Sequence, residues 1–295
     1  MAALKRTFCL FAVVGMIAFA GKPAQALEIS DMLAGSEASA NVVGSSILDW
    51  VLNGANHSGG ASYYYGIGSS PEALISSLPL IGGPTLAGNS VNATYGNGEL
   101  AIDFGVEITA VPGVSSMTVT MNATSSSNNL DLSIFEVHNM NLSGTAGDDT
   151  IGFAGGSTPP PPPQPSNVEQ TDADSTFTQN SEASILGGVG GTDVFPSHWE
   201  LSANPAALLA LMTDGDADTL ADTPNDTNPI GAADVAHAFQ WDASLMSDDT
   251  LQIIVRKQLR SDLVGEVIPE PVTSMLSLLG LAVIGGTAAG RRRSA

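Results

Sequence analysis

Cysteine is almost absent from this sequence. The only one, Cys9, lies in an apolar stretch near the N-terminus. Once that stretch is removed, the chain has no thiol, so disulfides, cysteine metal sites and cysteine nucleophiles are all excluded. The stability of the remaining chain must therefore come from an apolar core.

Basic residues are nearly as scarce. Of the nine lysines and arginines, three lie near the N-terminus and three at the C-terminus, which leaves only Arg256, Lys257 and Arg260 between them. The same interval holds all 30 acidic residues, and three basic against 30 acidic residues gives a formal charge of −27. Such a surface repels phosphate backbones and attracts cations, so we predict no nucleic-acid partner.

Familiar catalytic motifs are also missing. The sequence contains no His-Glu-x-x-His zinc motif, no Gly-x-Ser-x-Gly elbow and no phosphate-binding loop followed by Lys-Ser/Thr. Its four histidines are scattered: His57, His138, His198 and His237. We therefore predict that the protein is not an enzyme. A Ser/His/Asp triad assembled across the fold stays open as an alternative, because triads are defined by geometry.

The N-terminus has the pattern of a secretory signal. Lys5 and Arg6 precede an apolar stretch over 8–20, and small residues frame the tripeptide Ala24-Gln25-Ala26. A signal peptidase reads small residues at these positions, so we predict export through the secretion machinery and cleavage after Ala26. A retained N-terminal anchor is the alternative, although it would need a longer apolar run.

The C-terminus has the pattern of a membrane span. Residues 272–290 include no charged side chain and are followed at once by Arg291, Arg292 and Arg293. A helix of this length reaches about 28 Å, close to the roughly 30 Å of bilayer hydrocarbon. The arginines predict a cytoplasmic end, which places the body of the protein on the outer side of the inner membrane. The alternative is a buried core helix.

A proline-flanked glutamate precedes this span, as Pro269-Glu270-Pro271. The order of triplet, apolar span and terminal arginines over 269–293 resembles the PEP-CTERM sorting signal of Gram-negative bacteria, also called the ice-binding protein C-terminal domain. The resemblance implies recognition of the triplet by exosortase, a membrane-embedded cysteine protease. Two prolines prevent helix continuation and keep the triplet extended, where a protease can bind it. A rigid spacer is the alternative reading.

The body over 27–268 reads as mainly β. Alternating apolar residues from Leu100 to Ile108, from Met117 to Met121 and from Leu130 to Ile134 predict three strands, which we expect to form a meander. A hairpin is predicted from Phe239 to Val255, and Trp199 with Leu201 indicates another strand. The number of strands favours a β-sandwich or jelly roll.

Other parts of the body are less regular. Proline at the first helical position predicts short helices after Ser70 and after Asn204. Residues 29–53 are ambiguous between helix and strand, with a helical pattern at the end. The proline-rich segment 159–165 predicts an extended polyproline stretch, either a linker or, as we favour, a loop within one sandwich.

Alternating carboxylates over 214–222 are the best candidate for a cation site. Asp214, Asp216, Asp218 and Asp222 occupy spacings used by calcium loops, which crowd oxygen atoms around one ion. The loop lacks the central glycine and the final bidentate glutamate of an EF-hand, so a solvated acidic loop is the alternative. We therefore carry Ca²⁺ as a hypothesis and expect no other cofactor.

A run of three tyrosines, Tyr63 to Tyr65, is a second candidate site. It predicts either an exposed platform for sugars or, as we favour, core packing. The stretch 234–245, DVAHAFQWDASL, resembles one near the end of many PEP-CTERM protein bodies, which implies a β scaffold with Trp241 in its core.

Taken together, these patterns predict an exported cell-surface or matrix protein, non-enzymatic, with an exosortase-type protease and exopolysaccharide as expected partners. A calcium-dependent or carbohydrate-binding adhesin is the first alternative, and a secreted hydrolase is the second.

Overall fold

The computed structural model describes residues 26–33, 36–153, 167–173, 177–184, 195–223 and 229–261. Four features of the sequence lie outside these ranges: the signal segment up to residue 25, the prolines of 159–165, the triplet at 269–271, and the span with its arginines. Within the described ranges, no helix has the length and apolar character needed to cross a membrane. The two predicted terminal segments therefore stay predictions.

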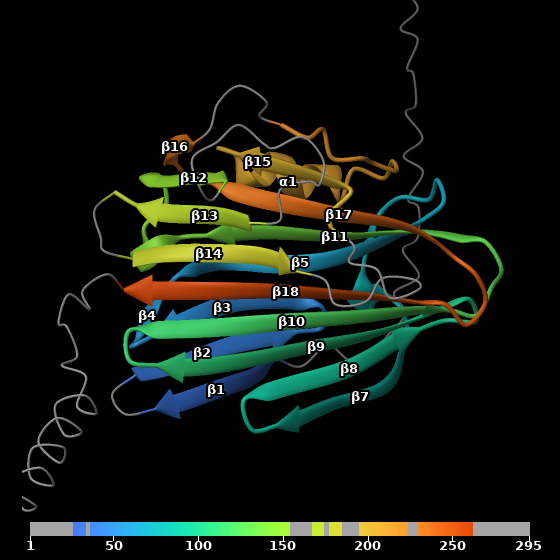
Figure 1. The fold of residues 1–295 in the computed structure, drawn as a ribbon, viewed down its shortest axis with the longest axis horizontal. Coiled ribbons are helices and arrows are strands. Elements are labelled where there is room, and N and C mark those ends of the chain that lie inside the picture. Colours follow the sequence, from blue (N-terminus) through green and yellow to red (C-terminus); the bar gives the residue numbers. More distant parts are fainter. Residues whose placement is uncertain are drawn as a thin grey trace, which may run out of the picture.

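The fold consists of two nine-stranded sheets in which all named strand pairs are antiparallel (Figure 1). Sheet A has seven strands along its main path, in the order β1 (Leu27–Leu33), β2 (Ser36–Val43), β3 (Ser46–Leu52), β5 (Ser58–Ile67), β11 (Leu130–Met140), β17 (Ala236–Leu245) and β15 (His198–Ser202). Short strands β4 (Ala55–Asn56) and β6 (Ala73–Leu74) pair with β3 and β5.

Sheet B runs in the order β16 (Ile230–Ala233), β12 (Asp149–Phe153), β13 (Asn167–Asp172), β14 (Phe177–Ser184), β18 (Thr250–Ser261), β10 (Val114–Ser125), β9 (Leu100–Val111), β8 (Ser90–Gly96) and β7 (Leu80–Ala87). Strands β12 and β13, which flank the proline-rich segment, pair with one another. The mainly β prediction is confirmed, with antiparallel sheets throughout.

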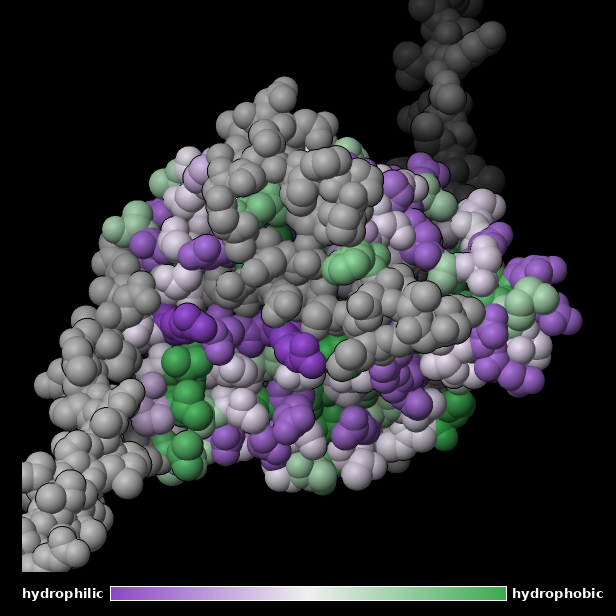
Figure 2. All heavy atoms as spheres, viewed as in Figure 1, coloured by the Kyte–Doolittle hydropathy of each residue, from purple (hydrophilic) through white to green (hydrophobic). Residues whose placement is uncertain are grey.

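Strand β10 shows why these sequences form strands. Met117, Val119 and Met121 are buried, whereas the residues between them, such as Thr118 and Thr120, are partly exposed. A period of two puts successive side chains on opposite faces, and β-branched threonine suits the pleated outer surface. Figure 2 shows the result on one face of the molecule, where hydrophilic and hydrophobic residues are interspersed.

The two sheets pack against each other through one large core. Trp50 of β3 donates its indole N–H to the hydroxyl of Ser115 on β10, at 2.9 Å. The rings of Phe153 on β12 and Trp199 on β15 meet edge to face, with centroids 4.6 Å apart. Trp241 is completely buried, as predicted. Aromatic residues thus join the sheets without any disulfide.

Two predicted pairings are wrong. The expected meander breaks after β10, because β11 pairs with β5 and β17 in sheet A, not with β10. The expected hairpin of β17 and β18 does not form either, since β18 pairs with β10 and β14 in sheet B. In both places a short connection crosses from one sheet to the other. A period of two predicts that one face is buried but does not say to which sheet a strand belongs.

The short predictions had mixed outcomes. Helix α1 (Pro205–Leu211) follows Asn204, as expected. The predicted helix after Ser70 is wrong: the chain there forms β6 and then a 3₁₀ turn, η1 (Ile75–Ser77). The helical pattern at the end of 29–53 is also wrong, because β3 alternates, with Ile47 buried and Leu48 53% exposed.

Helix α1 covers part of the outer face of sheet A. Its Leu208, and Met212 just beyond it, pack in a small cluster with Tyr64 of β5 and Phe135 of β11. This second layer leaves the ends of β11 and β17 nearest Leu130 and Leu245 open on the same face.

Candidate functional site

A polar groove lies on the outer face of sheet A, where β11 and β17 run side by side. The register places Asp131 opposite Ser244 and Ser133 opposite Asp242. The hydroxyl of Ser133 donates to Oδ1 of Asp242, and that of Ser244 donates to Oδ1 of Asp131, each at 2.6 Å. The groove encloses about 310 Å³, and its lining also includes Gly68 of the β5–β6 connection. We call these four paired residues and their hollow the carboxylate groove.

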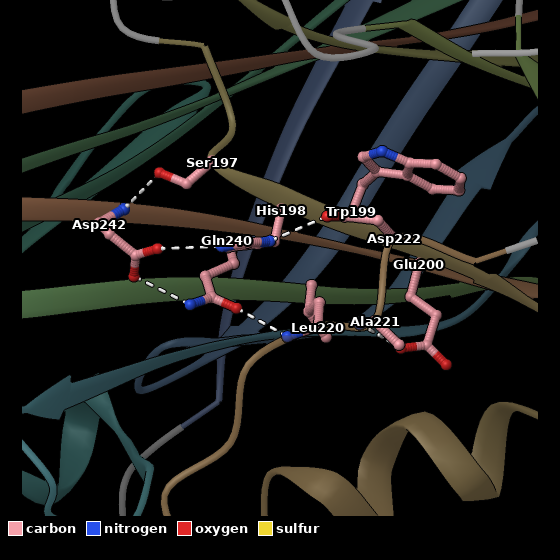
Figure 3. Close-up of polar contacts among 9 residues, drawn as sticks. All are labelled: Ser197, His198, Trp199, Glu200, Leu220, Ala221, Asp222, Gln240 and Asp242. Carbon is pink, nitrogen blue, oxygen red and sulfur yellow. Dashed lines mark hydrogen bonds and ion pairs between the residues drawn. The ribbon is translucent and has the colours of Figure 1, made fainter. Parts of the chain in front are cut away.

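A histidine extends the carboxylate groove toward β15. Nδ1 of His198 lies 3.0 Å from Oδ2 of Asp222, and Nε2 lies 3.7 Å from Oδ2 of Asp242 (Figure 3). Asp222 also accepts the backbone N–H of Trp199 at 3.0 Å, which fixes the loop against β15. The side chain of His198 is 32% exposed. It is therefore held between two carboxylates at the molecular surface.

Gln240 connects the groove to the loop that follows α1. Its Nε2 donates to Oδ1 of Asp242 at 2.9 Å, and its Oε1 accepts the N–H of Leu220 at 2.9 Å (Figure 3). The backbone N–H of Asp242 donates to the hydroxyl of Ser197. Because the side chain of Gln240 is buried and both ends of its amide are bonded, the carboxylate of Asp242 has a fixed orientation.

The order of these groups does not match a nucleophilic triad. Such a triad needs a histidine between the serine and the carboxylate, so that the imidazole removes the hydroxyl proton. Here Asp242 lies between Ser133 and His198, and the serine donates directly to the carboxylate. The groove is thus a set of oriented hydrogen-bond acceptors rather than an activated nucleophile.

Three of the four aspartates of the calcium hypothesis lie close enough for their charges to interact. Asp214 accepts the backbone N–H of Asp216 at 3.0 Å, within the same loop. The backbone N–H of Asp218 donates to the carboxylate of Glu72 at 2.8 Å, although Glu72 lies far away in the sequence. Asp222 instead contacts His198. Calcium binding by this loop stays a prediction, and Asp222 is already engaged elsewhere.

Glu72 lies next to this loop, a contact that the sequence did not predict. Burial raises the pKa of its carboxyl group, and the charges of Asp218 and Asp214 act in the same direction. Burial also raises the pKa of Asp218, with Asp214 and Asp216 adding to the effect. These carboxylates therefore repel one another in the absence of a cation.

A second acidic group lies at the end of sheet B. Ligand oxygens of Asp148, Asp149 and Asp172 fall within 4.8 Å of one another. Asp149 is fully buried, and its Oδ2 accepts N–H groups from Gln170 at 2.9 Å and Leu142 at 3.4 Å. Burial raises its pKa to about 7, and the charges of the two other aspartates contribute. Oxygen groups of this kind suit a hard cation, although an acidic cluster alone does not establish one.

Two of the predicted tyrosines, and the histidines of β11 and β17, have buried side chains. Tyr63 is fully buried in the main core, and Tyr64 is buried under α1, so the platform reading of the tyrosines is wrong for both. The histidines are not all scattered: the β11–β17 register sets His138 opposite His237, with ring centroids 5.3 Å apart. Sequence spacing could not reveal this pair, because its members lie on different strands.

No family model matches the chain, and no curated protein matches it. Among solved structures, a galactose mutarotase related enzyme from Lactobacillus acidophilus has a TM-score of 0.45 at 8% identity, covering 80% of this chain and 98% of that one. A galactose mutarotase-like protein from Lactobacillus casei has a TM-score of 0.42 at 8% identity, with 79% and 100% covered.

A bacterial glucoamylase complexed with acarbose has a TM-score of 0.46 at 8% identity, covering 88% of this chain and 36% of that one. At such low scores and identities, none of these structures defines the fold or the activity of this protein.

Proposed function

We propose that this chain is an exported envelope or matrix protein of a Gram-negative bacterium, delivered by a PEP-CTERM-type tail. One observation carries this proposal: the fold fits between the two sorting segments. Strand β1 begins at Leu27, directly after the expected cleavage at Ala26, and β18 ends at Ser261, ahead of Pro269. Removal of both segments leaves every described strand intact.

Glu270→Ala tests the proposal. In wild-type cells we expect a mature protein that lacks both the first 26 residues and the C-terminal tail. The variant is expected to stay in the inner membrane with its tail attached. Glu270 is the only charged side chain of the triplet, and without it the protease should no longer recognise this sequence. Cell fractionation followed by mass spectrometry of both chain ends measures this.

The matched control is Glu266→Ala, which removes the same charge four residues earlier and leaves the triplet unchanged. The control is expected to be processed like wild type. An intact tail in the wild-type protein would mean a permanent anchor, and the proposed processing by an exosortase-type protease would be wrong.

The carboxylate groove supports a second proposal, that the exported body binds a neutral polysaccharide. Asp131 and Asp242 hold fixed carboxylates on an open face, and sugar hydroxyls donate well to such groups. The acidic surface disfavours a negatively charged glycan unless cations bridge the two.

We expect the double variant Asp131→Ala, Asp242→Ala to bind neutral exopolysaccharide of the producing bacterium at least about tenfold more weakly than wild type. The reason is that each charge-assisted hydrogen bond contributes about 1.5–3 kcal/mol. Affinity electrophoresis in gels containing the polysaccharide measures the difference. Asp214→Ala, Asp216→Ala is the control with the same charge change outside the groove. Equal retardation of both double variants would contradict a role for the groove.

A further inference from the structure

Five polar side chains lie in the interior of the sandwich, between the two sheets. Tyr63, Glu136, His138 and His237 project from sheet A, and Lys257 projects from β18 of sheet B. Each is no more than 2% exposed. We call them the interior cluster.

Lys257 and Glu136 are in direct contact at the centre of this cluster. The ammonium group of Lys257 donates to Oε1 of Glu136, and its Nζ lies 2.8 Å from Nδ1 of His138. The hydroxyl of Tyr63 donates to the same Oε1 at 3.1 Å. Oε2 of Glu136 is buried and has no hydrogen-bond partner among the described residues. The buried interior cluster therefore brings together an amine (Lys257), a carboxyl group (Glu136), an imidazole (His138) and a hydroxyl donor (Tyr63).

Burial favours the neutral forms of Lys257 and His138. Burial lowers the pKa of the Lys257 amine, although the charge of Glu136 opposes this shift. Burial and the charge of Lys257 lower the pKa of His138 well below its usual value, so its imidazole is neutral and Nδ1 can accept a hydrogen bond. A charged pair in such a site carries a large desolvation cost.

We propose that Lys257 and Glu136 condense to an intramolecular amide bond that joins the two sheets. Transfer of one proton across their contact gives a neutral amine and a carboxylic acid. Nζ of Lys257 then attacks Cδ of Glu136, a C–N bond forms, and the bond from Cδ to Oε2 breaks. The departing Oε2 takes the proton that Oε1 received from Lys257 and one further proton from the amine, and leaves as water, so no oxidant or cofactor is required.

Two neighbours assist this reaction. Nδ1 of His138 touches the attacking nitrogen, so it can accept a hydrogen bond from the amine while the C–N bond forms. The hydroxyl of Tyr63 donates to Oε1 and stabilises the negative charge that develops there. Because the cluster is buried, water has no easy access to reverse the step.

The bond would serve a chain that has no disulfide. Its two residues are 121 positions apart, so it would close a long loop and restrict the unfolded chain as a disulfide does. It would also link β11, an interior strand of sheet A, to β18 at the centre of sheet B.

Mass spectrometry tests the proposal directly. We expect the purified full-length or naturally processed protein to be lighter than its sequence by the mass of one water molecule. Digestion with chymotrypsin, which has cleavage sites close to both residues, should release one branched peptide that joins Lys257 to Glu136. The variant Lys257→Met should have its full sequence mass and no branched peptide.

Loss of water from Asp214-Gly215 by succinimide formation would change the total mass equally, so the branched peptide is the deciding observation. His138→Gln should yield a smaller cross-linked fraction than wild type, measured at the same time after purification. A wild-type protein that unfolds and refolds normally, but contains only linear Lys257 and Glu136 peptides, would overturn the proposal.

Discussion

Replacement of Lys257 by methionine is expected to leave a fold about 3–5 kcal/mol less stable than the double variant Lys257→Met, Glu136→Leu. Among the described residues, Lys257 is the cation that contacts Glu136, so the single variant leaves an unpaired carboxylate in the sandwich core, where its side chain has no exposure. The double variant replaces both groups with apolar side chains of similar volume. Neither protein can form the proposed amide, so the comparison measures the buried carboxylate, less the hydrogen bond that it accepts from Tyr63.

Chemical denaturation of the two variants under identical conditions gives this difference. Arg260→Met is the control, because Arg260 is an exposed basic residue on the same strand and its loss should cost less than about 0.5 kcal/mol. Equal stability of the single and double variants would show that water or another group reaches Glu136 inside the sandwich.

Removal of the Trp50 side chain should lower the free energy of unfolding by a similar amount. Trp50→Ala is expected to destabilise the protein by about 3–5 kcal/mol, because a large, 1%-exposed ring between the sheets is replaced by a cavity. The midpoint of urea unfolding should fall with little change in slope.

Ser115→Ala separates the hydrogen bond of Trp50 from its packing. This variant keeps the indole ring but leaves its N–H buried without the acceptor at 2.9 Å, a change that costs about 1–3 kcal/mol. A Trp50→Ala cost no larger than that of Ser115→Ala would mean that the ring contributes little to the contact between the sheets.

Local sequence patterns predicted strands well and their partners poorly. Strands β9 and β10 follow directly from their alternation, and they pair as a hairpin across Pro112-Gly113. The connections after β10 and after β17 are equally short, yet each crosses to the opposite sheet. Hairpins and crossings have the same local signature, because the choice depends on which distant strand completes the neighbouring sheet.

The candidate sites were harder to predict, because register and packing bring their members together. The carboxylate groove depends on the pairing of residues 131 and 133 with 244 and 242. This register joins two strands that are far apart in the sequence, so the spacing of residues along the chain does not predict it. The interior cluster left a weak signal: Glu136 and His138 take inward positions in line with Ile134, and Lys257 does so between Val255 and Leu259. Polar residues at apolar positions of a strand indicate a buried network.

Strand β18 is the last described element of the chain, yet it lies in the middle of sheet B, between β14 and β10. Its long-range pairings can form only after residue 261 has left the ribosome. Until then, β10 and β14 each lack one of their two partner strands, and one side of the core stays open. Folds dominated by such distant pairings close slowly. The order of the strands therefore delays completion of sheet B until almost the whole described body has been synthesised, a delay that would suit the export that we propose.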